Sequence, residues 1–445
     1  MKQLLVLALC AGLFVLHTPA MAASSEELTD IRNQLRSLME RVDRLEQENA
    51  ALRARNETLQ GQDDHLKSDM RSVREQPAAQ ADQVEAGESA ARVAFKGDLR
   101  YRHEQIRDDT LDAAGVRTAD RYRDRIRMRL NAQAQVTNNI SVGIGFATVE
   151  GGDPRSTNQT LGDVFSRKSL DLDLAYFSWS FADGMQLIGG KMQQPFFKPG
   201  QSLYWDGDVN PEGLAFTFER GVLFGSAYGY WVDEFSGPEN ARTSDTMLFG
   251  GQIGARLPLG ESNLVLAAHY YDLSAGQGRA PFFDGDPSGN TTITVGTPPE
   301  AVLLYDYRVV DLMAELNTSL GAQWGDLPLQ AWADIAQNQD PSRLETAWAA
   351  GATLGAAARA RTWQFGAAYY SVEKDALFAQ LIDNDLGGGL SDAAGWVLRA
   401  GYAPVENVTL NATYFINKRN VDVPNAAGQT DVDHKRLQLD LNLNF

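Results

Sequence analysis

Apolar and polar residues alternate with a period of two in sixteen segments between residues 92 and 445. In the first segment Val93, Phe95 and Leu99 alternate with charged residues, and the chain ends with Leu443 and Phe445 in the same pattern. Successive side chains point to opposite faces of a β-strand, so each segment predicts one apolar face and one polar face. The repeated pattern predicts a large antiparallel β-sheet.

The connections between these segments alternate in length. Long polar stretches such as 107–121 and 273–304 follow the odd-numbered segments, whereas short turns such as Thr137-Asn138-Asn139 follow the even-numbered ones. Transmembrane barrels have short turns at one end, long loops at the other and an even number of strands. A soluble β-sandwich gives no reason for long loops at one end only. We therefore predict an all-β transmembrane barrel of 16 antiparallel strands, with 14 to 18 possible, over residues 92–445.

The composition agrees with a membrane crossing that uses no helix. The longest apolar run of the 445 residues, Leu4 to Leu16, has 13 residues, whereas a membrane-spanning helix needs roughly 20. This run precedes Ala20-Met21-Ala22, so residues 1–22 are predicted to be a signal peptide, whose removal also takes away Cys10, the only cysteine. The formal charge of −18 opposes binding to nucleic acid, which needs a basic surface.

A heptad pattern fills the segment between the signal peptide and the barrel. Over residues 23–76 apolar residues recur with alternating gaps of three and four, which predicts an α-helical coiled-coil stalk. Asn49, Asn56 and Asp63 fall at successive a positions, where polar side chains fix the register. A solvated single helix is the alternative. Residues 77–91 are rich in small residues and predict a flexible linker.

Three stretches of the chain resemble Gram-negative outer-membrane porins. They are the terminal residues 439–445, the segment LIGGK at 187–191, and WDGDVNPEGL at 205–214. The chain is most similar to the putative porin family that carries a periplasmic coiled coil before its barrel. The resemblance implies a homotrimer, a stalk in the periplasm, and a role for the final Phe445 as the signal read during assembly into the outer membrane.

A strip of basic residues is predicted on the polar face of neighbouring strands. It comprises Arg100, Arg102, Arg123, Arg125, Arg127, Arg129 and Lys191. Charges of this kind are too costly on the lipid face, so they predict the wall of a water-filled pore. The alternative is pairing with wall carboxylates such as Asp98, Asp171 and Asp173, which would only stiffen the barrel. The resemblance to general porins implies that loop 195–212 folds inward and sets Asp206, Asp208 and Glu212 against the arginines.

These features predict a porin for passive diffusion of ions and small hydrophilic solutes across the outer membrane. Two alternatives stay open: a protein that tethers the outer membrane to peptidoglycan or a periplasmic partner through the stalk, and a channel specific for phosphate or another anion. Membrane lipid and lipopolysaccharide are the expected surroundings of the barrel. The sequence contains no nucleophile motif, phosphate loop or zinc-ligand spacing, so we predict no enzymatic activity, no cofactor and no metal.

Overall fold

The computed structural model describes residues 93–445 except 113, 235–244, 274–275, 322 and 324–325. The predicted signal peptide, stalk and linker lie outside the described residues. Within the part that is described, no helix is long and apolar enough to cross a membrane.

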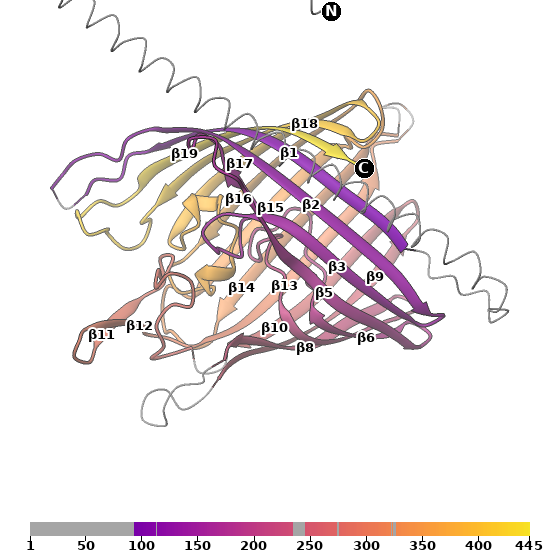
Figure 1. Ribbon diagram of the computed structural model, residues 1–445, viewed down its shortest axis with the longest axis horizontal. Helices are drawn as coiled ribbons and strands as arrows, with labels where there is room; N and C mark the ends of the chain where they lie inside the picture. The colour runs from indigo at the N-terminus through magenta and orange to yellow at the C-terminus, as the bar shows by residue number, and fades with distance from the viewer. Residues whose placement is uncertain (1–92, 113, 235–244, 274–275, 322, 324–325) are drawn as a thin grey trace, which may run out of the picture. The chain divides into compact units, whose positions relative to one another are not determined.

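Sixteen strands form one closed antiparallel barrel, which confirms the predicted fold (Figure 1). The first eight are β1 (Val93–Asp108), β2 (Arg121–Thr137), β3 (Ile140–Val149), β5 (Ser169–Ala182), β6 (Met185–Lys191), β7 (Glu212–Arg220), β8 (Leu223–Asp233) and β9 (Thr246–Leu259). The other eight are β10 (Ser262–Leu273), β13 (Tyr307–Ser319), β14 (Pro328–Asn338), β15 (Thr346–Gly355), β16 (Thr362–Val372), β17 (Ala393–Val405), β18 (Val408–Arg419) and β19 (Val432–Asn444). The barrel closes where β1 pairs with β19, with Tyr101 opposite Leu441.

The remaining short elements belong to the connections. They are β4 (Gln159–Thr160), the hairpin strands β11 (Thr292–Val295) and β12 (Glu300–Leu303), and the 3-10 helices η3 (Ala379–Leu381) and η4 (Leu386–Gly388). Long connections gather at one end of the barrel, where the β11–β12 hairpin projects, and tight turns such as 138–139 and 183–184 join strands at the other end (Figure 1). The predicted alternation of loop lengths is thus present.

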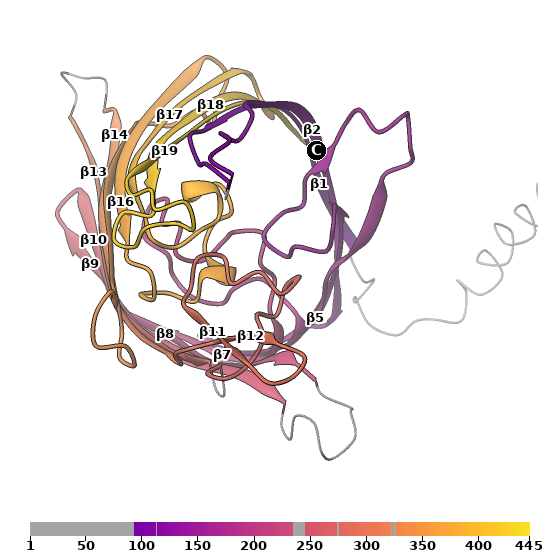
Figure 2. The ribbon, with the colours of Figure 1, turned by 90° about the vertical axis from the view of Figure 1, so that its left-hand side faces the viewer.

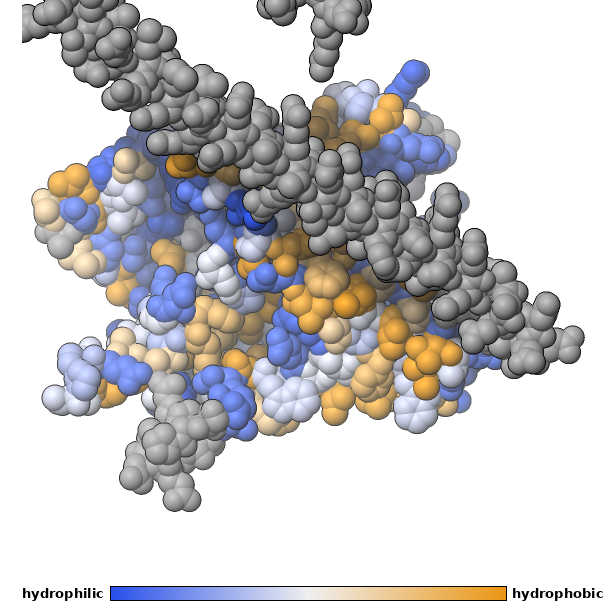
Figure 3. Space-filling model, in the orientation of Figure 1, coloured by the Kyte–Doolittle hydropathy of each residue, from blue (hydrophilic) through white to orange (hydrophobic). Residues whose placement is uncertain are grey.

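The outer face of the barrel is apolar. Trp363, Phe365 and Trp396 on adjacent strands are each at least half exposed, and hydrophobic side chains cover much of the visible outer wall (Figure 3). Large apolar side chains in such numbers are stable only against an apolar environment. Burial of the outer face in a membrane therefore explains why every second residue of the strands is apolar and yet faces away from the interior of the barrel.

The interior is partly filled by two long connections that fold inward. The 192–211 loop, between β6 and β7, and the 373–392 loop, between β16 and β17, both cross the lumen (Figure 2). Their apolar side chains, among them Trp205 and Phe378, pack against wall aromatics such as Tyr307 in one buried cluster. Large apolar burial of this kind holds the loops inside the barrel and closes the adjoining part of the lumen.

Polar contacts also hold the 192–211 loop to the wall. The Gly200 amide donates a hydrogen bond to Glu315 Oε2 at 2.5 Å, and the Ser202 hydroxyl donates to Asp334 at 2.5 Å. A Cβ atom at position 200 would lie 2.1 Å from Trp332 Cδ1, so glycine is required for the close approach. Its φ of +48° is also in the left-handed region that glycine adopts readily.

Candidate functional site

Six arginines form a continuous wall on the lumen face of β1 and β2. Backbone pairing sets Arg100 opposite Arg127 and Arg102 opposite Arg125, while Arg123 and Arg129 lie opposite carboxylates of β1. Directly opposed residues of an antiparallel pair share one face of the sheet. The six arginines of the predicted strip are therefore brought together by the strand register.

Carboxylates form ion pairs with most of these guanidinium groups. Asp98 accepts ion pairs from Arg127 and from Arg129, each at 2.7 Å, and Glu104 pairs with Arg123. Arg102 donates two hydrogen bonds to Asp440 on β19, at 2.7 and 2.8 Å. The alternative of paired arginines thus describes part of the wall, with Asp98 as one partner as the sequence suggests.

Arg100 is different from its neighbours. Its Nη2 donates to the side-chain oxygen of Asn158 at 2.6 Å, and its buried Nε atom has no hydrogen-bond partner. Among the described residues no carboxylate lies within ion-pair distance of this guanidinium group. Arg100 is therefore the arginine of this wall that has no direct carboxylate partner in the described residues, although Asp440 and Asp208 act on it from a greater distance.

Two of the predicted loop acids reach this side of the barrel. Asp208 lies 3.4 Å from Arg129 and accepts hydrogen bonds from the amide and hydroxyl of Thr157, at 3.1 and 3.0 Å. Asp206 is buried beside it and accepts the backbone amide of Asn384 at 3.1 Å. The 192–211 loop thus carries acids toward the arginine wall.

Lys191 and Glu212, two further residues of the predicted site, pair with each other and not with the six arginines or their carboxylates. They pair with each other at 3.0 Å, and Lys191 Nζ also donates to the Asn210 carbonyl. The start of the loop puts these two residues at the end of the β6–β7 pair, where Lys191 pairs with Glu212 and not with a carboxylate of the arginine wall.

The 373–392 loop supplies acids that the sequence analysis did not assign. Asp385 accepts an ion pair from Arg102 at 3.2 Å, pairs with Arg436, and accepts the amide of Gln438 at 2.8 Å. The Asp383 amide donates to the Leu203 carbonyl at 2.9 Å, which joins the two inward loops. The sequence did contain a signal: this long connection carries large apolar residues such as Leu386, which are rare in exposed loops. In the structure Leu386 is fully buried.

A cavity of about 230 Å³ lies where the wall and the loops meet. Arg155 reaches it from the connection after β3 and donates to the carbonyls of Ala379 and Gly389, at 3.1 and 3.3 Å. Its charged lining consists of Arg100, Arg102, Arg127, Arg155, Arg399, Asp206, Asp208, Asp383 and Asp385. We call this cavity the constriction. Five guanidinium groups therefore meet four carboxylates in a narrow space.

The loop carboxylates of the constriction titrate differently. Burial raises the pKa of Asp206 well above its usual value, and the nearby Asp383 and Asp208 raise it further. Burial and the Asp385 carboxylate raise the pKa of Asp383 to about 6, although Arg399 and Arg436 oppose the rise. Burial would also raise the pKa of Asp385, but Arg436 and Arg102 hold it below its usual range. Asp385 is thus a fixed charge and Asp383 a charge that mild acid removes.

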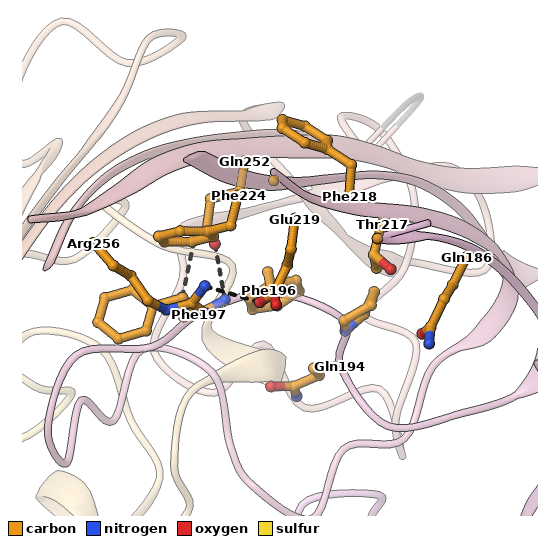
Figure 4. Close-up of a pocket in the computed structure, with 13 residues that line it drawn as sticks. Gln186, Gln194, Phe196, Phe197, Thr217, Phe218, Glu219, Phe224, Gln252 and Arg256 are labelled. Carbon is orange, nitrogen blue, oxygen red and sulfur yellow. Dashed lines mark hydrogen bonds and ion pairs between the residues drawn. The ribbon is translucent and has the colours of Figure 1, made fainter. Parts of the chain in front are cut away.

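A second cavity, of about 480 Å³, lies between the 192–211 loop and the strands β6 to β9 (Figure 4). At its edge, Gln252 forms two hydrogen bonds with the backbone of Phe197. The Gln252 side-chain amide donates to the Phe197 carbonyl, and the Gln252 side-chain oxygen accepts from the Phe197 amide, both at 2.8 Å. Arg256 pairs with Glu219 at 2.8 Å and lies 4.1 Å from the centre of the Phe224 ring. These contacts fix the start of the inward loop to the barrel.

Comparison with known proteins identifies the family. A family model described as "Putative porin" matches residues 59–294 and 305–445. The chain belongs to this porin family. Among solved structures, OprB of Pseudomonas putida is similar to the porin with a TM-score of 0.52 and 13% identity, over 79% of this chain and 94% of that one. OmpT of Vibrio cholerae matches with a TM-score of 0.46 and 13% identity, over 80% of this chain and all of the other. No curated protein sequence matches significantly.

Family and fold together assign the barrel to the outer membrane, where the porin is a channel for passive diffusion. The long connections are then external loops and the short turns are periplasmic. Both chain ends of the barrel lie on the periplasmic side, where the Phe445 amide and carbonyl pair with Gly97 at 3.0 and 2.8 Å. Phe445 is 67% exposed on the outer wall.

Proposed function

We propose that solutes cross this porin along the arginine wall and that the constriction sets which of them pass. The inward loops support this path, because they cover the opposite part of the wall. Ala347 and Tyr370 are fully buried beneath them, and Ala336 is 1% exposed. Water and solutes are thereby kept to the side of the lumen that carries charge.

A charge-balanced constriction favours weak ion selectivity over a channel devoted to phosphate or another anion. The single observation that carries this is the near equality of five arginines and four carboxylates around one cavity. Planar-bilayer recording across gradients of potassium chloride and potassium phosphate tests it. We expect a small reversal potential in both salts. A large reversal potential of anion-selective sign would favour the anion-specific alternative.

Mild acid should make the porin more selective for anions. Because the pKa of Asp383 is about 6, lowering the pH from about 7.5 to about 5 protonates this carboxyl and leaves the arginines charged. The reversal potential in a potassium chloride gradient should therefore shift toward that of chloride. Asp383→Asn should show the shifted value already at neutral pH and a reduced pH dependence, because Asp206, whose pKa burial also raises, remains in the constriction. An Asp383→Asn porin with the pH response of the wild type would contradict this assignment.

We also propose that the porin is a homotrimer, as the resemblance implies. A polar patch on the outer face supports a protein contact there. The Asp124 carboxylate on β2 accepts a hydrogen bond from the Tyr101 hydroxyl at 2.9 Å and lies 3.0 Å from His103 Nδ1. Lipid is a poor environment for such groups, so a neighbouring subunit is a better cover for them.

The external loop beside this patch is expected to stabilise the trimer. The Leu161 amide donates to the Asp124 carbonyl at 2.8 Å, and the following Val164 and Phe165 are almost fully exposed. The double variant Val164→Ser, Phe165→Ser should lower the temperature at which oligomers dissociate on gels, with barrel folding unchanged. The control Val116→Ser changes an exposed apolar residue of another external loop. Equal dissociation temperatures for both variants would argue against the contact.

The predicted coiled coil is proposed to project into the periplasm and to contact peptidoglycan or a periplasmic partner. The family match begins at residue 59, inside this segment, which supports its belonging with the barrel. Deleting residues 24–91 should leave the unit conductance unchanged and weaken the envelope. We propose no enzymatic activity for the porin.

A further inference from the structure

We propose that the constriction binds small zwitterions of the α-amino acid type, with the carboxylate on Arg100 and the ammonium group between Asp206 and Asp383. This inference rests on the proposed function of the constriction and names its solute class. It depends on which charges in the cavity are already paired and which are not.

Most charges of the constriction neutralise one another. Arg102 pairs with Asp440 and Asp385, Arg127 pairs with Asp98, and Arg155 is held by Asp153 at 3.1 Å. A guanidinium group that already donates to a carboxylate attracts a solute anion weakly. These residues therefore shape the cavity more than they attract an ionic solute.

Of the lining guanidinium groups, Arg100 and Arg399 form no carboxylate ion pair within the described residues. Because Arg399 acts on Asp383 across the cavity, Arg100 is the group that we assign to a solute carboxylate. Its one hydrogen bond in the described structure goes to a neutral amide, Asn158, and its Nε atom is buried with no acceptor. A carboxylate can accept two parallel hydrogen bonds from one guanidinium group. Binding of a solute carboxylate at the Nη atoms would therefore give the Arg100 guanidinium group a charged acceptor, where the fold supplies only a neutral one.

Asp206 and Asp383 form the complementary acidic side. Within the described residues, both carboxylates accept hydrogen bonds from backbone amides only: Asp206 from Asp208 and Asn384, and Asp383 from Asp385. Their mutual repulsion contributes to the raised pKa of Asp206. An ammonium group between them would relieve this repulsion and supply the donors that the carboxylates lack.

Size and charge together select the solute class. The cavity of about 230 Å³ is smaller than typical sites for drug-sized ligands, so it suits a solute with few atoms. A simple anion would be attracted by Arg100 and repelled by the two carboxylates. A simple cation would be attracted by the two carboxylates and repelled by Arg100. A solute that carries both charges a short distance apart is the one that satisfies both sides.

Solute uptake into proteoliposomes that contain the full-length porin tests the zwitterion site. The two solutes are alanine and lactamide, which have equal size and no net charge. They have the same number of non-hydrogen atoms, and only alanine is a zwitterion. We expect alanine at low concentration to enter about three- to tenfold faster and to saturate, because charge-assisted hydrogen bonds are about twice as strong as neutral ones. Lactamide uptake should be slower and should not saturate.

Variants locate the site. Arg100→Gln and Asp383→Asn should each reduce alanine uptake to the lactamide rate, while Lys96→Gln, which removes a cation from the same strand outside the cavity, should leave it unchanged. Heat-dependent migration of each variant on gels, which distinguishes a folded barrel from an unfolded one, shows that the barrel is folded. Equal uptake of alanine and lactamide by the wild type would overturn the zwitterion site while leaving a diffusion channel. Competition of alanine uptake by lactate as strong as by excess alanine would also overturn it, in favour of an anion site. Absence of uptake of both solutes would overturn the proposed function itself.

Discussion

Replacing residues 376–390 by a short glycine-serine linker is expected to raise the unit conductance of the porin several-fold. These residues fill the lumen: Leu377, Phe378 and Ile382 are almost completely buried inside the barrel. The loop also supports the 192–211 loop, because the Leu381 carbonyl accepts the Asp206 amide at 2.7 Å. Its removal therefore opens one side of the lumen and loosens the other obstruction. Planar-bilayer recording of single channels measures the change.

A control for this deletion is the exposed tip of the β11–β12 hairpin. Residues 294–300 are exposed, and the hairpin projects from the external end of the barrel (Figure 1). Shortening this tip should leave the unit conductance as in the wild type. A loop-deleted porin that conducts no more than the wild type would show that the 373–392 loop does not narrow the path.

Replacing Arg102 by leucine is expected to destabilise the folded porin by about 3–5 kcal/mol, the cost typical of breaking a buried ion pair. The Arg102 side chain is 8% exposed, and its loss leaves the Asp440 and Asp385 carboxylates with fewer partners in a poorly solvated place. Since Asp385 anchors the 373–392 loop, the variant should also show noisier current. The free energy of unfolding is measured by urea titration in lipid vesicles.

Arg107→Leu is the matched control for that variant. Arg107 lies on the same strand, but its side chain is 61% exposed and its nearest carboxylate, Asp109, is 3.5 Å away. An exposed pair of this kind contributes at most about 1 kcal/mol. Equal losses of stability in the two variants would mean that the interior ion pairs are as well solvated as the surface.

The barrel could be predicted from the sequence because the alternation of side chains along a strand depends only on residues that are neighbours in the chain. The period of two in β1 and β19 follows directly from the pleat, and the alternation of long and short connections gives the topology without knowledge of any contact. The arginine wall follows from the same parity once β1 and β2 are paired. These parts of the structure depend on nearest neighbours along the chain and between adjacent strands.

The acidic side of the constriction could not be derived in the same way. Asp385 meets Arg102 although 283 residues separate them, and only the packing of an inward loop brings them together. A hint was present: Tyr228, Tyr307 and Tyr370 occupy the inward positions of their strands, where a water-filled pore would favour polar residues. Aromatic residues at these positions indicate that something apolar covers the wall.

Thiol labelling during single-channel recording tests the proposed path most directly. The barrel contains no cysteine, so single cysteines can be placed at Thr413, which lines the constriction, and at Ala349, which is 2% exposed beneath the inward loops. A charged thiol reagent should reduce the current of Thr413→Cys channels in discrete steps and leave Ala349→Cys channels unchanged. Block of the Ala349→Cys channels with none at Thr413→Cys, or absence of channel activity in the wild type, would contradict the account.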